Sequence, residues 1–230
     1  MCGRYGFIGT ADELREDFPT LDVIDPVVAG YNLSPGRRLS VLLPGPERLQ
    51  LRSLSWGLCT DRIPKPLVNV RAEGISAHRL FGPLFITHRC LIPASHFFEW
   101  LDDSEPRQPF VARPTHQAIL PQAARFRVDL AGLQLDGTFA VLTTKATGRL
   151  AEVHGRMPIL LNAEAARRWL DPKVKDVREL REAVAPLPQR AIDVYPVNPA
   201  VNDARTDGPV LLERKPSSRQ LRERDLDSRH

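Results

Sequence analysis

The stretch LLPGPERLQL, from Leu42 to Leu51, consists of two apolar runs that flank a turn rich in proline and glycine. Proline and glycine between two apolar runs are typical of a β-hairpin, because both residues favour tight turns. We therefore predict paired strands on either side of this turn, over Leu39–Leu43 and Leu49–Leu54.

Short strands and loops are indicated over most of the remaining chain, because its 21 prolines are scattered. Helices are predicted over Ala11–Phe18, Ala77–Phe85, Ala163–Leu170 and Lys175–Ala183, and further strands over Gly3–Ile8, Leu67–Arg71, Arg89–Ile92, Phe139–Thr143, Met157–Leu161 and Ile192–Val197. Asn162 is the expected N-cap of the third helix, and Pro172 follows its end. Strands outnumber helices, so we expect an α+β fold with a curved or barrel-like antiparallel sheet and peripheral helices. Residues 102–136 give no clear pattern.

The composition is ordinary for a globular domain, with 42% hydrophobic and 26% charged residues among 230. No apolar run is long enough to span a bilayer, and the N-terminal stretch MCGRYGFIGTADELRE lacks the basic and apolar regions of a secretory signal. The three cysteines, Cys2, Cys59 and Cys90, are too few for a disulfide framework. We therefore expect a cytoplasmic protein.

The positive charge is concentrated at the C-terminus. Residues 214–230 contain six basic and three acidic side chains, which account for most of the net charge of +4. We expect this segment to be a basic, disordered tail after a single domain over residues 1–213. Bulk charge is therefore weak support for DNA binding, and a DNA site would have to be a local patch.

Cys2 offers distinctive chemistry if Met1 is removed, because its α-amine and thiol then lie on adjacent carbons. Their ordinary pKa values, about 7.7–8.0 and about 8.5, make both partly nucleophilic near neutral pH. An aldehyde would form an imine with the amine, and the thiol would then close a five-membered thiazolidine ring, aided by proximity. Taken alone, Cys2 also fits an ordinary small residue at the start of a strand.

Other motifs contain groups suited to proton transfer or phosphate binding. In HFFEW, Glu99 lies between two aromatic residues, and apolar neighbours should raise the pKa of its carboxyl group, which suits a proton shuttle. In VHGRMPILL, His154 is suited to proton transfer near neutral pH, and Arg156 is suited to hold a phosphate. VNVRAEG contributes Asn69 and Arg71. Taken singly, each of these residues also fits a structural or solvent-facing role.

We expect neither a metal nor a cofactor. The cysteines lack metal-ligand spacing, and the six histidines form no HxH or HExxH arrangement. The chain also lacks a glycine loop of the kind that cradles phosphates.

Eight motifs follow one another along the chain: MCGRY at Met1, YNLSPG from Tyr31, WGL at Trp56, NVRAEG from Asn69, RCLIPASHFFEW from Arg89, FAVLTTKA from Phe139, VHGRMPILL from Val153 and VNPAVND from Val197. Each motif alone has only modest specificity, but the ordered set resembles the SOS-response-associated peptidase (SRAP) family of abasic-site crosslinking proteins. The likeness covers roughly residues 2–212. It implies strongly curved antiparallel strands with a DNA groove across one face.

The resemblance implies covalent attachment to abasic sites in single-stranded DNA, including single-strand/double-strand junctions, by a cytoplasmic protein that associates with the nucleoid when bound to DNA. Cys2 would be the nucleophile, and Glu99 would assist proton transfers in imine formation and ring closure. His154 would handle protons on the opened sugar, and Asn69 would orient the Cys2 amine or the sugar. The implied DNA contacts are Arg4, Arg71 and Arg156 to phosphates, and Pro35, Trp56 and Trp100 as apolar residues beside the strand.

Some positions depart from the family pattern. Phe98 stands where the family often has tyrosine, Val70 where alanine is usual, and Gly74 where threonine is usual. These positions surround the implied catalytic set, which is itself intact.

Two other functions stay open. An N-terminal cysteine can attack a carbonyl with His154 as base, as in a peptidase or amidohydrolase, and self-catalysed removal of Met1 would be a reaction of that kind. Against it, the sequence shows no clear oxyanion-hole signature. A non-enzymatic single-stranded DNA-binding module, in which Cys2 only packs, is the third hypothesis. Strand scission by a lyase reaction would be a side activity of the first hypothesis, the abasic-site crosslinking protein.

Overall fold

The predicted hairpin is present in the computed structural model, which describes residues 2–61, 63–101, 107–115, 127, 129–185 and 192–215. Strand β4 (Arg38–Pro44) pairs antiparallel with β5 (Leu49–Trp56) along its whole length. The Gly45 N–H donates to the Arg48 carbonyl oxygen across the turn (2.9 Å). The proline and glycine of the turn, with the apolar runs on either side, were therefore enough to predict this hairpin.

Most other elements of the described chain are also short strands. These are β1 (Arg4–Phe7), β2 (Asp22–Val23), β3 (Gly30–Leu33), β6 (Leu58–Thr60), β7 (Ile63–Leu67), β8 (Asn69–Arg71), β9 (Arg89–Ile92), β10 (His96–Trp100), β11 (Pro109–Pro114), β12 (Asp129–Leu135), β13 (Thr138–Lys145), β14 (Arg156–Pro158), β15 (Leu160–Leu161) and β16 (Ile192–Pro196). The helices are α1 (Ala11–Asp17), α2 (Phe81–Thr87), α3 (Ala163–Leu170) and α4 (Val177–Ala183), with 3-10 turns at Ile75–Ala77, Gly148–Glu152, Pro199–Asn202 and Pro209–Leu212.

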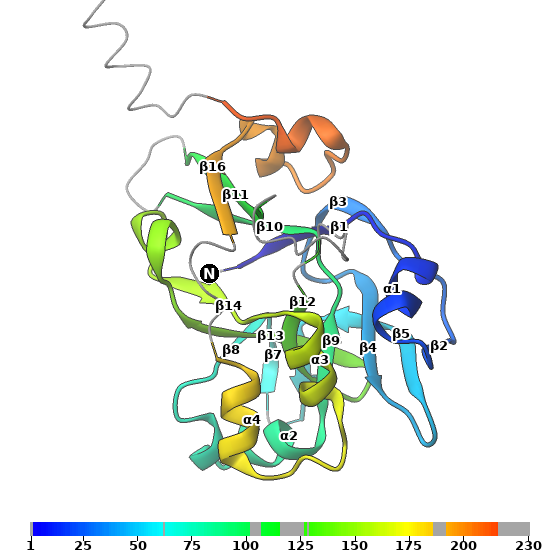
Figure 1. Cartoon of the computed structure of the whole chain (residues 1–230). Coiled ribbons are helices and arrows are strands. Elements are labelled where there is room, and N and C mark those ends of the chain that lie inside the picture. Colours follow the sequence, from blue (N-terminus) through cyan, green and yellow to red (C-terminus); the bar gives the residue numbers. More distant parts are fainter. Residues whose placement is uncertain are drawn as a thin grey trace, which may run out of the picture.

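The hairpin belongs to a nine-stranded sheet that closes on itself. Its strand order is β14-β13-β12-β9-β4-β5-β2, with β15 beside β12 and β8 beside β13. An additional pairing of β13 with β5 joins two distant members of this path, so β13, β12, β9, β4 and β5 form a barrel (Figure 1). The closing pair is parallel, with Phe139 opposite Trp56. The predicted α+β fold with a barrel-like, largely antiparallel sheet is confirmed, and the parallel closure is an addition to it.

A second sheet carries the N-terminus. Its order is β16-β11-β10-β1-β3, and all its pairings are antiparallel. Strand β10, which holds the HFFEW motif, was not predicted as a strand. Its residues from His96 to Glu99 are all buried, so the polar–apolar alternation that marks a half-exposed strand is missing. The C-terminal 3-10 turns pack on this sheet around Phe98, Tyr195 and Val201.

The helices lie outside the sheets (Figure 1), and their starts follow local chemistry. Asn162 caps α3 as predicted, because its side chain accepts a hydrogen bond from the Ala165 N–H (2.8 Å). The helix predicted over Ala77–Phe85 is shifted, and α2 begins at Phe81 after a separate 3-10 turn. Pro83 explains the shift, since proline is tolerated in the first turn of a helix but not in its interior.

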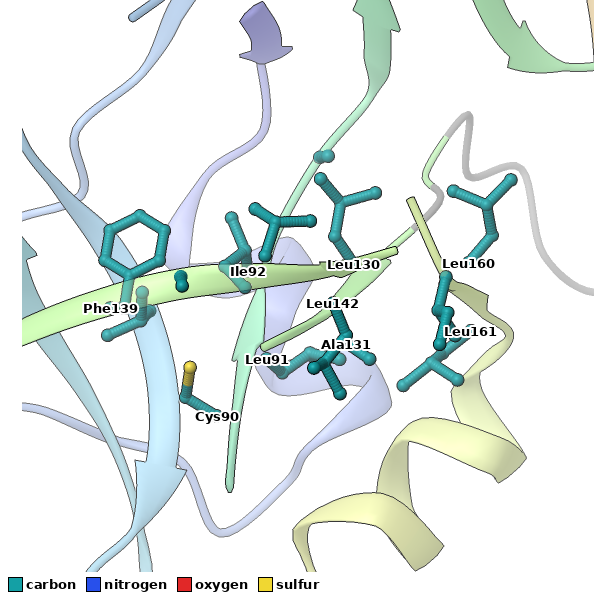
Figure 2. Packing of buried hydrophobic residues seen from close by; sticks show 14 of the residues in the cluster. Cys90, Leu91, Ile92, Leu130, Ala131, Phe139, Leu142, Leu160 and Leu161 are labelled. Atoms are coloured by element: carbon teal, nitrogen blue, oxygen red, sulfur yellow. The ribbon is translucent and has the colours of Figure 1, made fainter. Parts of the chain in front are cut away.

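The strands of the barrel bury apolar side chains on both of their faces, in one hydrophobic core. Figure 2 shows residues of β9, β12, β13 and β15 packed together, including Cys90, Leu91 and Leu130. Gly132 lies among them, and a Cβ at this position would be 2.4 Å from Ile92 Cδ1 and 2.9 Å from the Ala140 carbonyl oxygen. The close approach of these strands therefore requires glycine there.

The start of the predicted C-terminal tail is attached to the second sheet. Arg214 pairs with Val197 as an isolated bridge, donates to Asp193 (3.0 Å), and lies over the Tyr195 ring. The predicted tail after Lys215 lies outside the described residues, as do residues 102–106, 116–126 and 128 of the stretch that gave no clear pattern. Among the helices of the described chain, none is long and apolar enough to cross a membrane.

Candidate active site

Cys2 lies at the entrance of β1 and is fully buried. Its thiol donates weakly to the Arg4 carbonyl oxygen (3.8 Å), and its own carbonyl oxygen accepts a hydrogen bond from Asn69 Nδ2 (2.9 Å). Asn69 begins β8, which pairs with β13 in the other sheet. This hydrogen bond therefore joins the two sheets at Cys2, between residues 67 positions apart.

Glu99 approaches the same place along β10. Arg4 lies opposite Phe98 in the antiparallel β1–β10 pair, which brings the residues that precede β1 towards Glu99. The Glu99 side chain is only 2% exposed, so the alternative of a water-facing glutamate is wrong. Burial raises the pKa of the Cys2 thiol, and the negative charge of Glu99 raises it further. The resting sulfur is therefore a thiol rather than a thiolate.

His154 is half-buried in the turn before β14. Its ring Nδ1 accepts a hydrogen bond from the Arg156 backbone N–H (2.9 Å), and the backbone N–H of His154 donates to the Leu150 carbonyl oxygen (2.9 Å). Nδ1 also lies 3.1 Å from the Arg156 carbonyl oxygen, so both polar groups of the Arg156 backbone face this ring nitrogen. The backbone of the turn thus fixes the orientation of the ring.

The Arg156 guanidinium is engaged by a carboxylate. Nη1 and Nη2 each donate to one oxygen of Glu73, both at 2.8 Å, and Nη2 also donates to the Thr143 carbonyl oxygen (2.8 Å). Hydrogen bonding from Arg156 lowers the pKa of Glu73 to about 2. In this state the residue expected to hold a DNA phosphate already holds an anion.

Arg4 and Trp100 form a second polar cluster near Cys2. Arg4 Nη1 donates to Asn32 Oδ1 (2.9 Å) and to the Val201 carbonyl oxygen (2.8 Å), and its guanidinium lies 5.9 Å from the centre of the Trp100 ring. Trp100 Nε1 donates to Asn202 Oδ1 (2.6 Å). A hollow of about 460 Å³ opens here, lined by Gly3, Arg4, Trp100, Arg107 and Asn202.

The other predicted DNA contacts lie in different environments. Arg71 is exposed at the end of β8 and lines a hollow of about 300 Å³ together with Asn69, Glu73, His78 and others. Pro35 is half-buried in the turn after β3.

Trp56 requires a correction. It was expected to lie beside the DNA strand, but it is only 1% exposed, and its ring packs against Tyr5 and Phe139. Its Nε1 donates to the Val68 carbonyl oxygen (3.0 Å). In this conformation no face of the indole can stack on a base, because the barrel closure at β5–β13 covers it.

Sequence reasoning missed the residues that hold the predicted ones in place, namely Glu73, Asn32 and Asn202. Asn32 is 2% exposed; besides accepting from Arg4, its amide donates to the Asp203 and Thr206 carbonyl oxygens (3.0 and 2.9 Å). All three residues belong to the motifs YNLSPG, NVRAEG and VNPAVND, and their place in these motifs was the signal that could have identified them. Within the described residues, no group of three or more histidine, cysteine, aspartate or glutamate side chains is arranged to hold a metal.

Comparison with known proteins assigns this chain to a family. The model of the SOS response associated peptidase (SRAP) family matches residues 1–204. The chain belongs to this family. The resemblance seen in the eight motifs is thereby confirmed.

Two curated proteins are similar to the chain in sequence, and one solved structure is similar to it in fold. The chain is 31% identical over 222 residues to the abasic site processing protein YedK of Escherichia coli, covering 93% of this chain and 99% of that protein. It is 27% identical over 224 residues to the abasic site processing protein YoqW of Bacillus subtilis, covering 93% and 99%. A crystal structure of a protein from Bacteroides thetaiotaomicron superimposes with a TM-score of 0.75 at 20% identity, covering 94% of this chain and 100% of that one.

Proposed function

We propose that this protein processes abasic sites in DNA by bonding covalently to them through Cys2. The relatives named abasic site processing proteins support the substrate class. The observation that carries the chemistry is the placement of Cys2, held by Asn69 through its carbonyl group and lying within the electrostatic reach of Glu99. A residue that only packed would not need a buried carboxylate beside its thiol, since burying a charge is costly.

The proposed reaction starts once Met1 is removed, in a step that the protein itself catalyses. The Cys2 amine attacks the aldehyde carbon of the ring-opened sugar, and loss of one water gives an imine. The thiol sulfur then bonds to the imine carbon while the thiol proton passes to the imine nitrogen, which closes the thiazolidine. The net change is one water lost, with no oxidation or reduction.

Each polar side chain of the site has a step to assist. Ring closure moves the thiol proton to the imine nitrogen, and the carboxylate of Glu99, whose charge acts on the thiol, is suited to take this proton and return it to nitrogen. His154, oriented by the Arg156 backbone, is suited to protonate the departing sugar oxygen. Asn69 orients Cys2 through the carbonyl group that it binds. Strand scission at the abasic site is a side reaction of the same imine.

Single-stranded DNA, including the single strand at a duplex junction, is the proposed partner. Arg4, Arg71 and Arg156 would bind phosphates, while Pro35 and Trp100 would contact bases, which needs bases that are not paired. Trp56 supports the site from within the core instead. Such contacts carry little sequence information, so binding should be tolerant of sequence.

Incubation of the protein with an abasic single-stranded oligonucleotide tests the proposal on a denaturing gel. A shifted band that survives heating in detergent supports covalent capture. Cleavage of a test peptide without such a band would favour the peptidase hypothesis. Reversible binding alone would favour a DNA-binding module, and either of these results would overturn the proposal.

A further inference from the structure

Arg156 has no free edge for a fork-like contact with a phosphate. One edge of its guanidinium, between Nη1 and Nη2, is taken by both oxygens of Glu73. On the other edge, Nη2 donates to the Thr143 carbonyl oxygen, and the buried Nε has no hydrogen-bond partner among the described residues. Bidentate recognition of a phosphate uses two parallel N–H donors on one edge. A phosphate can therefore gain such a contact only at the edge that Glu73 occupies.

The two partners of this ion pair differ in their freedom to move. The Arg156 side chain is 17% exposed and is anchored to Thr143, whereas the Glu73 side chain is 49% exposed. Glu73 Oε1 also accepts hydrogen bonds from the Lys145 N–H (3.0 Å) and Thr144 Oγ1 (3.3 Å). The carboxylate is the outer partner, so it can swing into solvent while the guanidinium keeps its place.

We propose that Glu73 acts as a positioning residue that takes the place of a DNA phosphate on Arg156 in the free protein, and that binding of DNA exchanges the carboxylate for phosphate oxygens. This inference rests on the phosphate contact of Arg156 in the proposed function. A carboxylate presents two oxygens much as a phosphate does, so it keeps the guanidinium in a phosphate-binding orientation. The exchange breaks the ion pair between Glu73 and Arg156, so the carboxylate competes with any DNA that reaches this position.

The exchange at Arg156 also affects the turn that holds His154. The Arg156 N–H donates to His154 Nδ1, so the residue that undergoes the exchange also fixes the His154 ring. Arrival of a phosphate at Arg156 therefore places the DNA backbone beside the proposed proton donor.

The test measures equilibrium binding of single-stranded DNA that carries a tetrahydrofuran abasic analogue, which cannot open to an aldehyde. Glu73→Gln keeps the shape of the side chain and removes its charge. Fluorescence anisotropy at several salt concentrations should show about two- to fivefold tighter binding at low salt, the range expected for losing one partly exposed ion-pair competitor. The log–log salt dependence should steepen by up to about 0.7, because Arg156 then neutralises a phosphate without releasing a carboxylate.

Glu47→Gln is the matched control, because it removes the same charge from an exposed position in the β4–β5 turn. It should leave the salt dependence close to that of the wild type. The gain from Glu73→Gln should also vanish in an Arg156→Ala background. Thermal unfolding establishes that each variant is folded, and Glu73→Asp, which is too short to span both nitrogens, should show part of the gain if Glu73→Gln does not fold.

The outcomes separate this inference from the proposed function. If Arg156→Ala binds DNA as the wild type does, the phosphate contact itself is wrong. If Arg156→Ala weakens binding but folded Glu73→Gln binds no tighter than the wild type, the contact stands and the exchange is overturned.

Discussion

Replacing Asn69 by alanine tests the hydrogen bond that holds the proposed nucleophile. In the structure Asn69 Nδ2 donates to the carbonyl oxygen of the fully buried Cys2 at 2.9 Å. The other amide atom, Oδ1, is buried without a partner among the described residues, so it is available to the Cys2 amine once Met1 is gone. Alanine removes the donor and the acceptor together and leaves a buried carbonyl oxygen unsatisfied.

The expected loss follows from that single contact. An unsatisfied buried polar group costs about 1–3 kcal/mol, and each 1.36 kcal/mol is a tenfold change in rate. If the whole cost falls on the arrangement needed for ring closure, crosslinking should slow by about 5- to 150-fold. Asn69→Asp should lose more, because a carboxylate cannot donate to the Cys2 carbonyl oxygen and sets a negative charge against it.

The assay is the single-turnover rate of crosslinking to an abasic oligonucleotide at saturating protein. Asn162→Ala is the matched control, since it removes an asparagine hydrogen bond of 2.8 Å at the start of α3. That variant should lose about 1 kcal/mol of stability and keep its crosslinking rate. A folded Asn69→Ala variant that crosslinks within twofold of the wild type would refute the role assigned to this hydrogen bond.

Three further outcomes are expected. Cys2→Ala keeps an α-amine but no thiol, so it should give no stable adduct while borohydride still traps a transient imine; a stable adduct without borohydride would place the nucleophile elsewhere. Gly132→Ala should lower the free energy of unfolding in urea by about 1–3 kcal/mol, because its Cβ would overlap Ile92; an unchanged midpoint would contradict this packing. Glu73 has its pKa lowered from 4.5 to about 2, so its ion pair stabilises the fold fully above pH 4.5 and less as the pH falls towards 2. The excess Tm of the wild type over Glu73→Gln should therefore shrink across that window, and a constant difference would exclude the ion pair as its source.

Features set by neighbouring residues could be predicted from the sequence. The β4–β5 hairpin and the Asn162 cap each depend on a few adjacent positions, and both are confirmed. The barrel closure could not be predicted, because the parallel pairing of β13 with β5 joins residues more than 80 positions apart and leaves no local pattern. Strand β10 was missed for a related reason, since burial on both faces removes the alternation that marks a strand.

The candidate site, like the fold, could be predicted from the sequence only in part. The order of the motifs identified the family and pointed to Cys2 and Asn69, which the fold brings into contact. Residue type alone could not tell which way an aromatic side chain faces, and Trp56 proved to be a core residue. The ion pair between Glu73 and Arg156 could not be predicted from the sequence either, because it forms only where β8 and β14 flank the end of β13.

The central claim is that the amine and the thiol of one N-terminal cysteine capture the abasic aldehyde together. Intact mass spectrometry of the protein after reaction with an abasic oligonucleotide tests it most directly, alongside a variant with an alanine inserted between Met1 and Cys2. The proposed chemistry predicts that protein beginning at Cys2 gains the mass of the oligonucleotide less one water, and that the inserted variant, whose Cys2 nitrogen is an amide, gains nothing stable. Equal adduct formation by the inserted variant would contradict the thiazolidine.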